Sequence, residues 1–330
     1  PHRYHPWISV NSKGWNRAQN VEVLHFDARS GRSQWKKTSR SQVGFKARFY
    51  LNAQPGEEYT ISAQPLDTPE DSRSWLRHLS KKFNNVDSFA IPLDLGDSDT
   101  NMRSKELPGI LISENMELKR PNLVVVGGQH PPEVMGRRGL QFFIEEILAA
   151  NALSKNFRDK FNVIAIPMIN ETGIALGHWR HNTRGVDSNR DWAPGDLGFQ
   201  SPETRALRNL LNSFDSEKNP HVAFFDFHST YKITAYAPDS QGSDRSFLEC
   251  FEKSVQSSNP KFKQWAPRWF SPEKYNSIGF MWSQRQYKIP SIAIEFDDNM
   301  DLSDARKFAQ SLANSSMALL LNPGSCSTKK

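Results

Sequence analysis

The pattern of hydrophobic and polar positions changes near residue 67. Before this point, three short segments alternate apolar and polar side chains between turn residues: 21–26, 44–51 and 58–64. This pattern is typical of antiparallel β-strands. After it, Pro69 and Asp71 lie in an acidic first turn, and apolar residues follow at helical spacing. We therefore expect a small β-rich accessory unit over residues 1–66 and a larger domain over residues 67–330.

Apolar runs and helical patterns alternate in the larger domain. Four runs predict strands: 122–126, 163–169, 222–227 and 289–296. Three longer stretches predict helices: 134–153, 201–214 and 301–321. Strands that are apolar throughout and separated by helices indicate an α/β fold with a mixed, mostly parallel central sheet flanked by helices. Such sheets bind ligands at the carboxyl ends of their strands, so the residues that follow each strand indicate function.

Two histidines and two glutamates occur at these strand ends. His130 and Glu133 form an H-x-x-E pair in GGQHPPE, and His228 in DFHST follows about 95 residues later. Alone, H-x-x-E is a weak signal, because a solvated histidine beside an unrelated glutamate has the same spacing. A hydrolytic zinc site uses three N or O ligands and one open position. Together with Glu295 in AIEFDDN, the three residues predict a hydrolytic metal site.

The segment WRHNTRGVDSNRDW, residues 179–192, is dense in directed hydrogen-bond donors. It carries three arginines among amide and carboxylate side chains: Arg180, Asn182, Arg184, Asp187, Asn189 and Arg190. Guanidinium groups match carboxylates and developing oxyanions in shape and charge. The segment therefore predicts a loop that binds an anionic part of a substrate.

HPPE, WRHNTRGVDSNRDW, DFHST and AIEFDDN occur in the order and approximate spacing of the zinc metallocarboxypeptidase family, and the chain resembles a bacterial-type member over about residues 69–322. The resemblance implies one Zn²⁺ per chain, held by His130, Glu133 and His228. It implies Glu295 as the general base that activates a zinc-bound water, and Arg180 as the group that stabilises the oxyanion. It also implies a peptide or peptide-like substrate.

Further residues follow from the same resemblance. Asn189 and Arg190 would bind the substrate's free C-terminal carboxylate, and Asp187 would hold His130 from behind. Tyr275 is the nearest candidate for the family's mobile tyrosine, and Phe280 falls near the position that lines the side-chain pocket. No Asp or Glu lies between Lys274 and Pro290, which disfavours basic C-terminal residues.

Two residues in and beside the D-x-N-R segment depart from the family's usual sequence, and the first is Ser188, which stands where leucine or alanine is usual. Asp191 follows Arg190 where asparagine is common, so its carboxylate could occupy the guanidinium and weaken carboxylate capture. Ser201, Pro202 and Glu203 match the start of a helix, for which we expect a structural role.

Composition limits the other functions. The chain has 42 Lys and Arg against 36 Asp and Glu, a net charge of +6 that is spread along the sequence. We expect no nucleic-acid partner, because affinity for polyanions requires clustered charge. One basic cluster with interleaved aromatic residues, between residues 29 and 48, fits either a polyanion site or the solvated face of a hairpin. No apolar run reaches the length of a membrane span.

The cysteines and the start of the chain give little information about the fold or the location of the protein. The two cysteines, Cys250 and Cys326, do not suffice for a disulfide framework or a cysteine-based metal site. Because the chain begins at Pro1, we expect that a signal peptide or a larger precursor segment has been removed. A periplasmic or secreted location and a cytoplasmic one both fit.

Three functions remain open from the sequence. The first is a metallocarboxypeptidase that removes a C-terminal residue, for which an exported protein could use peptidoglycan stem peptides. The second is an amidase or deacylase of the aspartoacylase type that acts on a small N-acyl amino acid. The third is a metal-binding or polyanion-binding module without catalysis. The long arginine-rich loop favours the peptidase, and no ligand or base is missing.

Overall fold

The computed structural model describes residues 7–11, 13, 15–18, 22–27, 32–37, 47–62, 64–95, 104–114, 119–193, 198–214, 217–271 and 275–326. The chain divides into two compact units, Pro1–Leu66 and Asp67–Lys330. No helix in the described ranges has the length and apolar character needed to cross a lipid bilayer.

The first unit contains two three-stranded antiparallel sheets. One has the order β2–β1–β6, formed by Trp15–Arg17, Trp7–Val10 and Tyr59–Ser62. The other has the order β4–β3–β5, formed by Arg32–Lys37, Glu22–Asp27 and Ala47–Arg48. Part of the basic cluster falls on β4, which pairs with β3 as a hairpin. The side chains of that strand, and residues 38–46, lie outside the described part of the chain.

The second unit is built on an eight-stranded sheet with the order β13–β12–β14–β11–β9–β10–β8–β7. In chain order the strands are β7 Val86–Pro92, β8 Glu106–Ile112, β9 Asn122–Gly127, β10 Asn162–Ile166, β11 His221–Thr230, β12 Thr234–Pro238, β13 Pro267–Phe270 and β14 Ser291–Asp297. The central strands β10, β9, β11 and β14 are parallel to their neighbours within this group. The predicted fold class, a mixed and mostly parallel sheet flanked by helices, is confirmed.

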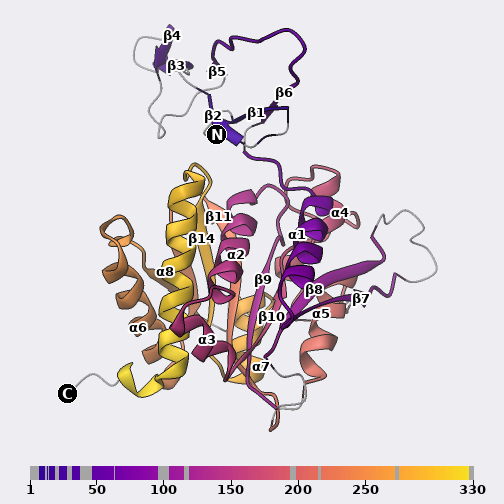
Figure 1. Ribbon diagram of the computed structural model, residues 1–330, viewed down its shortest axis with the longest axis vertical. Coiled ribbons are helices and arrows are strands. Elements are labelled where there is room, and N and C mark those ends of the chain that lie inside the picture. The colour runs from indigo at the N-terminus through magenta and orange to yellow at the C-terminus, as the bar shows by residue number, and fades with distance from the viewer. Residues whose placement is uncertain are drawn as a thin grey trace. The chain divides into compact units, whose positions relative to one another are not determined.

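Helices cover both faces of this sheet (Figure 1). The helices are α1 Pro69–Lys82, α2 Val134–Ile147, α3 Ala152–Arg158, α4 Glu171–Ala175, α5 Pro202–Asn212, α6 Ser243–Ser258, α7 Gly279–Tyr287 and α8 Leu302–Leu321. Short 3-10 turns occur at Ser188–Arg190, Pro260–Phe262 and Pro323–Cys326. One apolar cluster joins α1, α2, α3, α6 and α8 to one face, and another joins α5 and α7 to the opposite face.

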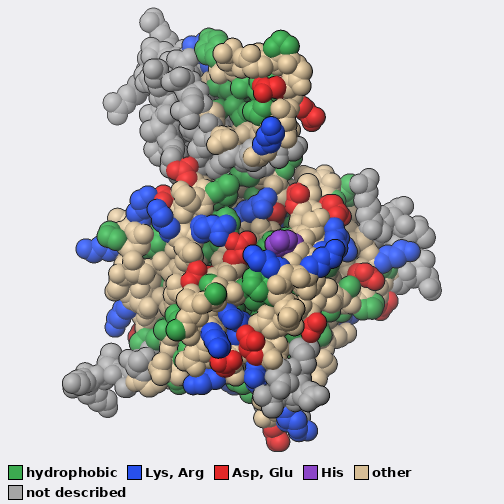
Figure 2. Space-filling model, in the orientation of Figure 1, with side chains coloured by type: hydrophobic (Ala, Val, Ile, Leu, Met, Phe, Trp, Pro, Cys, Tyr) green, Lys and Arg blue, Asp and Glu red, His purple; other side chains and the backbone are tan. Residues whose placement is uncertain are grey.

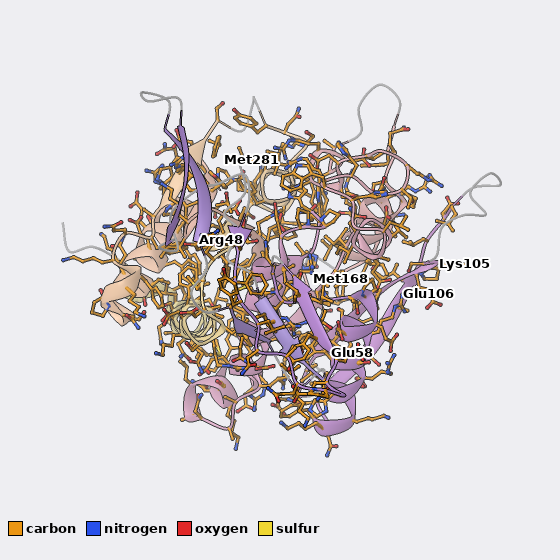
Figure 3. The ribbon with its side chains drawn as sticks, turned by 90° about the horizontal axis from the view of Figure 1, so that it is seen from above. Arg48, Glu58, Lys105, Glu106, Met168 and Met281 are labelled. Carbon is orange, nitrogen blue, oxygen red and sulfur yellow. The ribbon has the colours of Figure 1, made fainter. Side chains whose placement is uncertain are left out.

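Buried apolar side chains fill the interior of this unit, and Figure 3 shows the side chains as sticks from above. Met168, directly beyond β10, is fully buried, whereas Lys105 and Glu106 at the start of β8 lie at the periphery and are exposed. Alternate residues of β9 are buried on opposite faces of the sheet. Leu123 and Val125 belong to one apolar cluster, while Val124 and Val126 belong to the other, as expected for a strand buried on both sides.

One predicted helix is wrong in its extent. The pattern predicted a single helix over residues 134–153, but α2 ends at Ile147 and α3 begins at Ala152. The side chain of Asn151 accepts a hydrogen bond from the backbone N–H of Ser154 at 2.8 Å. Asparagine competes for backbone groups in this way and so starts a new helix instead of continuing the old one.

The close approach of α2 to β11 depends on Gly136. A β-carbon at this position would lie 2.6 Å from the backbone oxygen of His228. Only a residue without a side chain permits this distance. The contact brings the start of α2, and with it Glu133, to the end of β11 that carries His228.

Candidate active site

The register of the central sheet places the candidate residues on one face. His228 on β11 lies directly beside Glu295 on β14. The next row joins Asp226 to Ala293 in the same strands, and Ala293 in turn pairs with Tyr236 on β12. Neighbouring residues in paired strands point to the same face, and successive residues along one strand alternate. His228, Glu295 and the second row therefore face the same cavity.

His130 and Glu133 reach this cavity from the turn between β9 and α2. His130 Nδ1 lies 2.7 Å from Glu133 Oε1, and His228 Nδ1 lies 2.7 Å from Glu133 Oε2. One atom from each of the three side chains lies within 4.8 Å of the others. Two imidazole nitrogens and one carboxylate thus converge on a single point.

The charges in this cluster are strongly coupled. Burial alone would lower the pKa of His228, but the carboxylates of Asp226 and Glu133 outweigh it and raise that pKa well above its usual range. Burial likewise opposes ionisation of Glu133, yet the two imidazoles hold its pKa far below the usual value. The carboxylate of Glu133 therefore favours the protonated form of both imidazoles. A divalent cation would replace those protons.

The chemistry of the donor set fits zinc. Zn²⁺ accepts two imidazoles and a carboxylate and leaves a fourth position open in hydrolytic sites. Both imidazoles turn Nδ1 toward the common point, and their Nε2 atoms face carboxylates. His130 Nε2 lies 3.2 Å from Asp187 Oδ1, and His228 Nε2 lies 3.0 Å from Asp226 Oδ1. Carboxylates behind ligating histidines commonly fix the ring orientation.

Asp226 is a site residue that the sequence did not single out. It is fully buried, and its Oδ2 accepts a hydrogen bond from Gln129 Nε2 at 2.6 Å. The side-chain oxygen of Gln129, Oε1, accepts in turn from Trp192 Nε1 at 2.8 Å. The available signal was the D-x-H spacing on one strand, because residues two apart share a face.

Glu295 lies beside the cluster formed by His130, Glu133 and His228, and one of its carboxylate oxygens is not engaged by a described residue. Its Oε2 is buried and has no hydrogen-bond partner among the described residues. Burial, helped by the nearby charge of Glu133, raises the pKa of Glu295 to about 8. A carboxyl group whose pKa lies near neutral pH can both take up and release a proton there.

The arginine-rich loop between α4 and α5 forms another wall. Arg180 Nε donates to Asp187 Oδ2 at 2.6 Å, so Asp187 joins this guanidinium to His130. Asn189 accepts from the backbone N–H of Gly279 through Oδ1 at 3.2 Å, and its Nδ2 lies 3.3 Å from His228 Nε2. Arg190 Nη1 donates to the backbone oxygen of Asn189 at 3.0 Å.

Asp191 does not occupy the guanidinium of Arg190. Its Oδ2 accepts from the backbone N–H groups of Ser201 at 2.7 Å and Gln200 at 3.1 Å, at the start of α5. No carboxylate among the described residues forms an ion pair with Arg190. The extra negative charge after Arg190 therefore binds the backbone just before α5.

The walls enclose a cavity of about 370 Å³. Its lining is His130, Glu133, Arg180, Asn189, Arg190, His228, Ser229, Thr230, Tyr236, Arg268, Phe270, Tyr275, Ile278, Phe280, Ala293 and Glu295. The structure thus brings together all the predicted site residues except Asp187, which lies behind His130. Basic side chains lie on several sides of a histidine on the face shown in Figure 2.

Tyr275 and Phe280 border the cavity in different settings. The ring of Tyr275 packs edge-on against Phe270 at 5.0 Å, and Phe280 is buried in the first turn of α7. Sequence reasoning missed Arg268 and Tyr236 on β13 and β12, which are direct neighbours in the sheet. Neither stands in a recognisable motif, so only strand pairing brings them to the site.

Comparisons with known proteins agree with this geometry. A family model described as zinc carboxypeptidase matches residues 94–295. Mouse cytosolic carboxypeptidase 4 is 30% identical over 109 residues, which are 33% of this chain and 10% of that protein. Against five of the curated relatives that it matches, the chain spans between 7% and 13% of their length.

Solved structures share the fold. A metallo-carboxypeptidase from Burkholderia cenocepacia superimposes with a TM-score of 0.72 at 14% identity, covering 96% of this chain and 81% of that one. A metallo-carboxypeptidase from Pseudomonas aeruginosa gives a TM-score of 0.71 at 16% identity, with 96% and 80% coverage. The family match extends over most of the larger unit and includes the whole His–Glu–His cluster and Glu295, so the chain belongs to the zinc carboxypeptidase family, a family of metal-dependent hydrolases.

Proposed function

We propose that the protein removes the C-terminal residue of a peptide, with one zinc ion held by His130, Glu133 and His228. The observation that carries this proposal is one cavity that joins the ligand cluster, Glu295 and a guanidinium without a described carboxylate partner, that of Arg190. When bound, zinc supplies Lewis-acid chemistry that polarises a carbonyl group and acidifies water.

Glu295 acts as the proton carrier of the reaction. Its Oε2 has no hydrogen-bond partner among the described residues, so it is available to take a proton from the attacking water. The same carboxyl group then gives a proton to the departing amine. A side chain that accepts and returns a proton contributes roughly 100- to 10,000-fold to a rate.

Arg180 stabilises the charge that develops on the substrate's carbonyl oxygen. The bond from its Nε to Asp187 fixes the plane of the guanidinium at the cavity wall. A donor that is held in place before the reaction stabilises an oxyanion without further reorganisation. Asp187 therefore serves both Arg180 and His130.

Arg190 binds the free carboxylate of the substrate, and Asn189 supports the same wall. A planar carboxylate matches the two parallel N–H groups of a guanidinium. Because Asp191 is bound at the start of α5, it does not compete for Arg190. This arrangement supports exopeptidase activity more strongly than the sequence did.

The side-chain pocket favours an acidic C-terminal residue. Arg268 lines the cavity next to Tyr236, and Phe270 packs against that tyrosine with ring centroids 5.2 Å apart. Among the described residues of the lining, Glu133 and Glu295 are the only acidic ones, and both belong to the reaction centre. A guanidinium in the pocket attracts a second carboxylate and repels a basic side chain.

The test is hydrolysis of paired peptides that differ only at the C-terminus, as a free acid or an amide, by the zinc-loaded protein with products detected by mass. We expect amidation to lower kcat/KM about 100-fold or more, which corresponds to about 2.7 kcal/mol. Muropeptides and N-acyl amino acids belong in the same panel. Equal rates on both peptides, or hydrolysis of N-acyl amino acids alone, would replace this proposal with the amidase function.

A further inference from the structure

The first turn of α5 contacts the arginine-rich loop at three separate places. The contacted part of this loop, residues 182–191, has no regular secondary structure except the short turn Ser188–Arg190. The contacts come from three residues of the helix start, Ser201, Glu203 and Thr204. The sequence assigned this helix start a structural role only.

The first of these contacts joins Asn182 to Glu203. Asn182 Nδ2 donates to Glu203 Oε2 at 3.1 Å, and both side chains are buried. The other end of the same amide, Oδ1, accepts from the backbone N–H groups of Arg184 and Val186, each at 3.0 Å. Glu203 thus holds the side chain that defines the backbone of the loop just before Asp187.

Two further contacts hold the far side of the loop. Thr204 Oγ1 lies 3.3 Å from the backbone oxygen of Ser188, to which it donates. Asp191 Oδ2 accepts from the Ser201 backbone at 2.7 Å. The segment that carries Asp187, Asn189 and Arg190 is therefore bracketed on both sides by one helix start.

Burial makes these contacts decisive for the loop. Glu203 is 2% exposed, Asn182 1% and Thr204 fully buried, so water does not replace a lost partner. A buried polar group left without its partner destabilises the conformation that buries it. Without Glu203, the loop gains freedom where Arg180 and Arg190 must face the substrate. A displacement of about 1 Å in such residues can reduce catalysis about 100-fold.

We propose that Glu203 is a positioning residue, which acts through Asn182 to hold the arginine-rich loop in the conformation that captures the substrate's carboxylate. This proposal rests on the proposed carboxypeptidase function. Glu203 touches neither the cavity lining nor the ligand cluster.

The hydrogen bonds at Glu203 define which substitution preserves the role. Oε2 accepts both from Asn182 and from Ser201 Oγ at 2.7 Å, whereas Oε1 is buried without a partner among the described residues. One carbonyl oxygen is enough for both bonds. Glutamine should therefore replace Glu203, and alanine should not.

The experiment compares Glu203→Ala and Glu203→Gln with Leu211→Ala, a cavity-forming change at a buried position further along α5. In Glu203→Ala we expect KM for a free-acid peptide to rise about 10-fold or more, with a smaller change in kcat and in zinc affinity. Hydrogen exchange at residues 182–191 should rise as well. Glu203→Gln should keep KM within about twofold, and Leu211→Ala should lower Tm while leaving KM and loop exchange unchanged.

Two results would overturn the inference: a lower Tm in Glu203→Ala with unchanged KM and loop exchange, or a Gln variant as impaired as the Ala variant. Hydrogen exchange needs no substrate. If the unmutated protein does not prefer free-acid peptides, the proposed function fails, while the exchange data still decide whether Glu203 orders the loop.

Discussion

In the half of the cavity that holds the metal ligands, His228 and Glu295 lie on strands of the central sheet, whereas the half that faces the substrate's carboxylate rests on a loop. His228 and Glu295 are direct neighbours in β11 and β14, so backbone hydrogen bonds set their separation. Arg180 and Arg190 have no such framework. Side-chain contacts with Asp187, and those between the loop and the start of α5, hold them in place.

This difference separates chemistry from recognition. Changes to groups on the sheet should abolish the reaction while the protein remains folded, because the strands do not depend on those side chains. Changes in the loop should affect which substrates bind. The buried histidines also differ in their electrostatic surroundings. Those of the metal cluster lie among carboxylates, whereas His221 has no carboxylate partner among the described residues.

The largest effect is expected for Glu295→Gln. The amide cannot accept a proton, so kcat should fall by about 1,000-fold or more, while zinc content and Tm stay near those of the unmutated protein. Single-turnover assays with zinc analysis measure this. Glu252→Gln, on α6 and away from the cavity, should be fully active; near-normal turnover of Glu295→Gln would remove that residue from the mechanism.

His228→Ala should weaken zinc binding more than any other change in the sheet half. Mutation of residues behind metal ligands costs up to about 100-fold in affinity, so loss of a ligand should cost more than that. Competition with a chelator at fixed pH gives the dissociation constant. The exposed His78→Ala, on α1, serves as the control, and full zinc occupancy and affinity in His228→Ala would show that the ligand assignment is wrong.

Arg190→Ala tests the loop half directly. The variant should lose most of the roughly 100-fold preference for free-acid over amidated peptides, because the guanidinium supplies the matched pair of donors. Zinc affinity should not change. Arg184→Ala, in the same loop but outside the cavity lining, should keep the preference; the same loss in both variants would point to loop disruption instead of carboxylate binding.

Arg268→Glu should change the side-chain preference by a smaller factor. We expect the ratio of rates on peptides ending in glutamate and in lysine to shift toward lysine by about tenfold or more, since the pocket charge is reversed. Lys263→Glu makes the same charge change at an exposed position outside the lining and should leave the ratio unaltered. An unchanged ratio in Arg268→Glu would mean that the substrate's side chain does not reach Arg268.

The smallest effect concerns His221, a buried histidine with no carboxylate partner among the described residues. Burial lowers its pKa, and the hydrogen bond from the ring to the backbone oxygen of Leu211 offsets this only in part. The folded protein therefore keeps His221 neutral while the unfolded chain binds a proton, so stability falls as the pH drops below about 6.5. Urea unfolding at pH 7.5 and 5.5 should show a larger acid loss for the unmutated protein than for His221→Gln; equal losses would contradict the assignment.

The sequence by itself determined the frame of the catalytic unit. Continuous apolar runs separated by helical patterns specify doubly buried strands and their flanking helices, because burial of apolar surface dominates local preference. The same runs locate the strand ends, and therefore His130, Glu133, His228 and Glu295. Where a single side chain competes for backbone groups, as Asn151 does, the hydrophobic pattern alone predicted one helix instead of two.

Only the tertiary structure decided the partners of polar groups in the site. Whether Asp191 binds Arg190 or the start of α5 depends on where a helix ten residues later packs. The local sequence does not show how close the start of that helix lies to Asp191. Asp226 and Arg268 reach the site through pairing of strands that are far apart in the chain. Hydrogen bonds act over about 3 Å and are directional, so their partners follow from the packed fold.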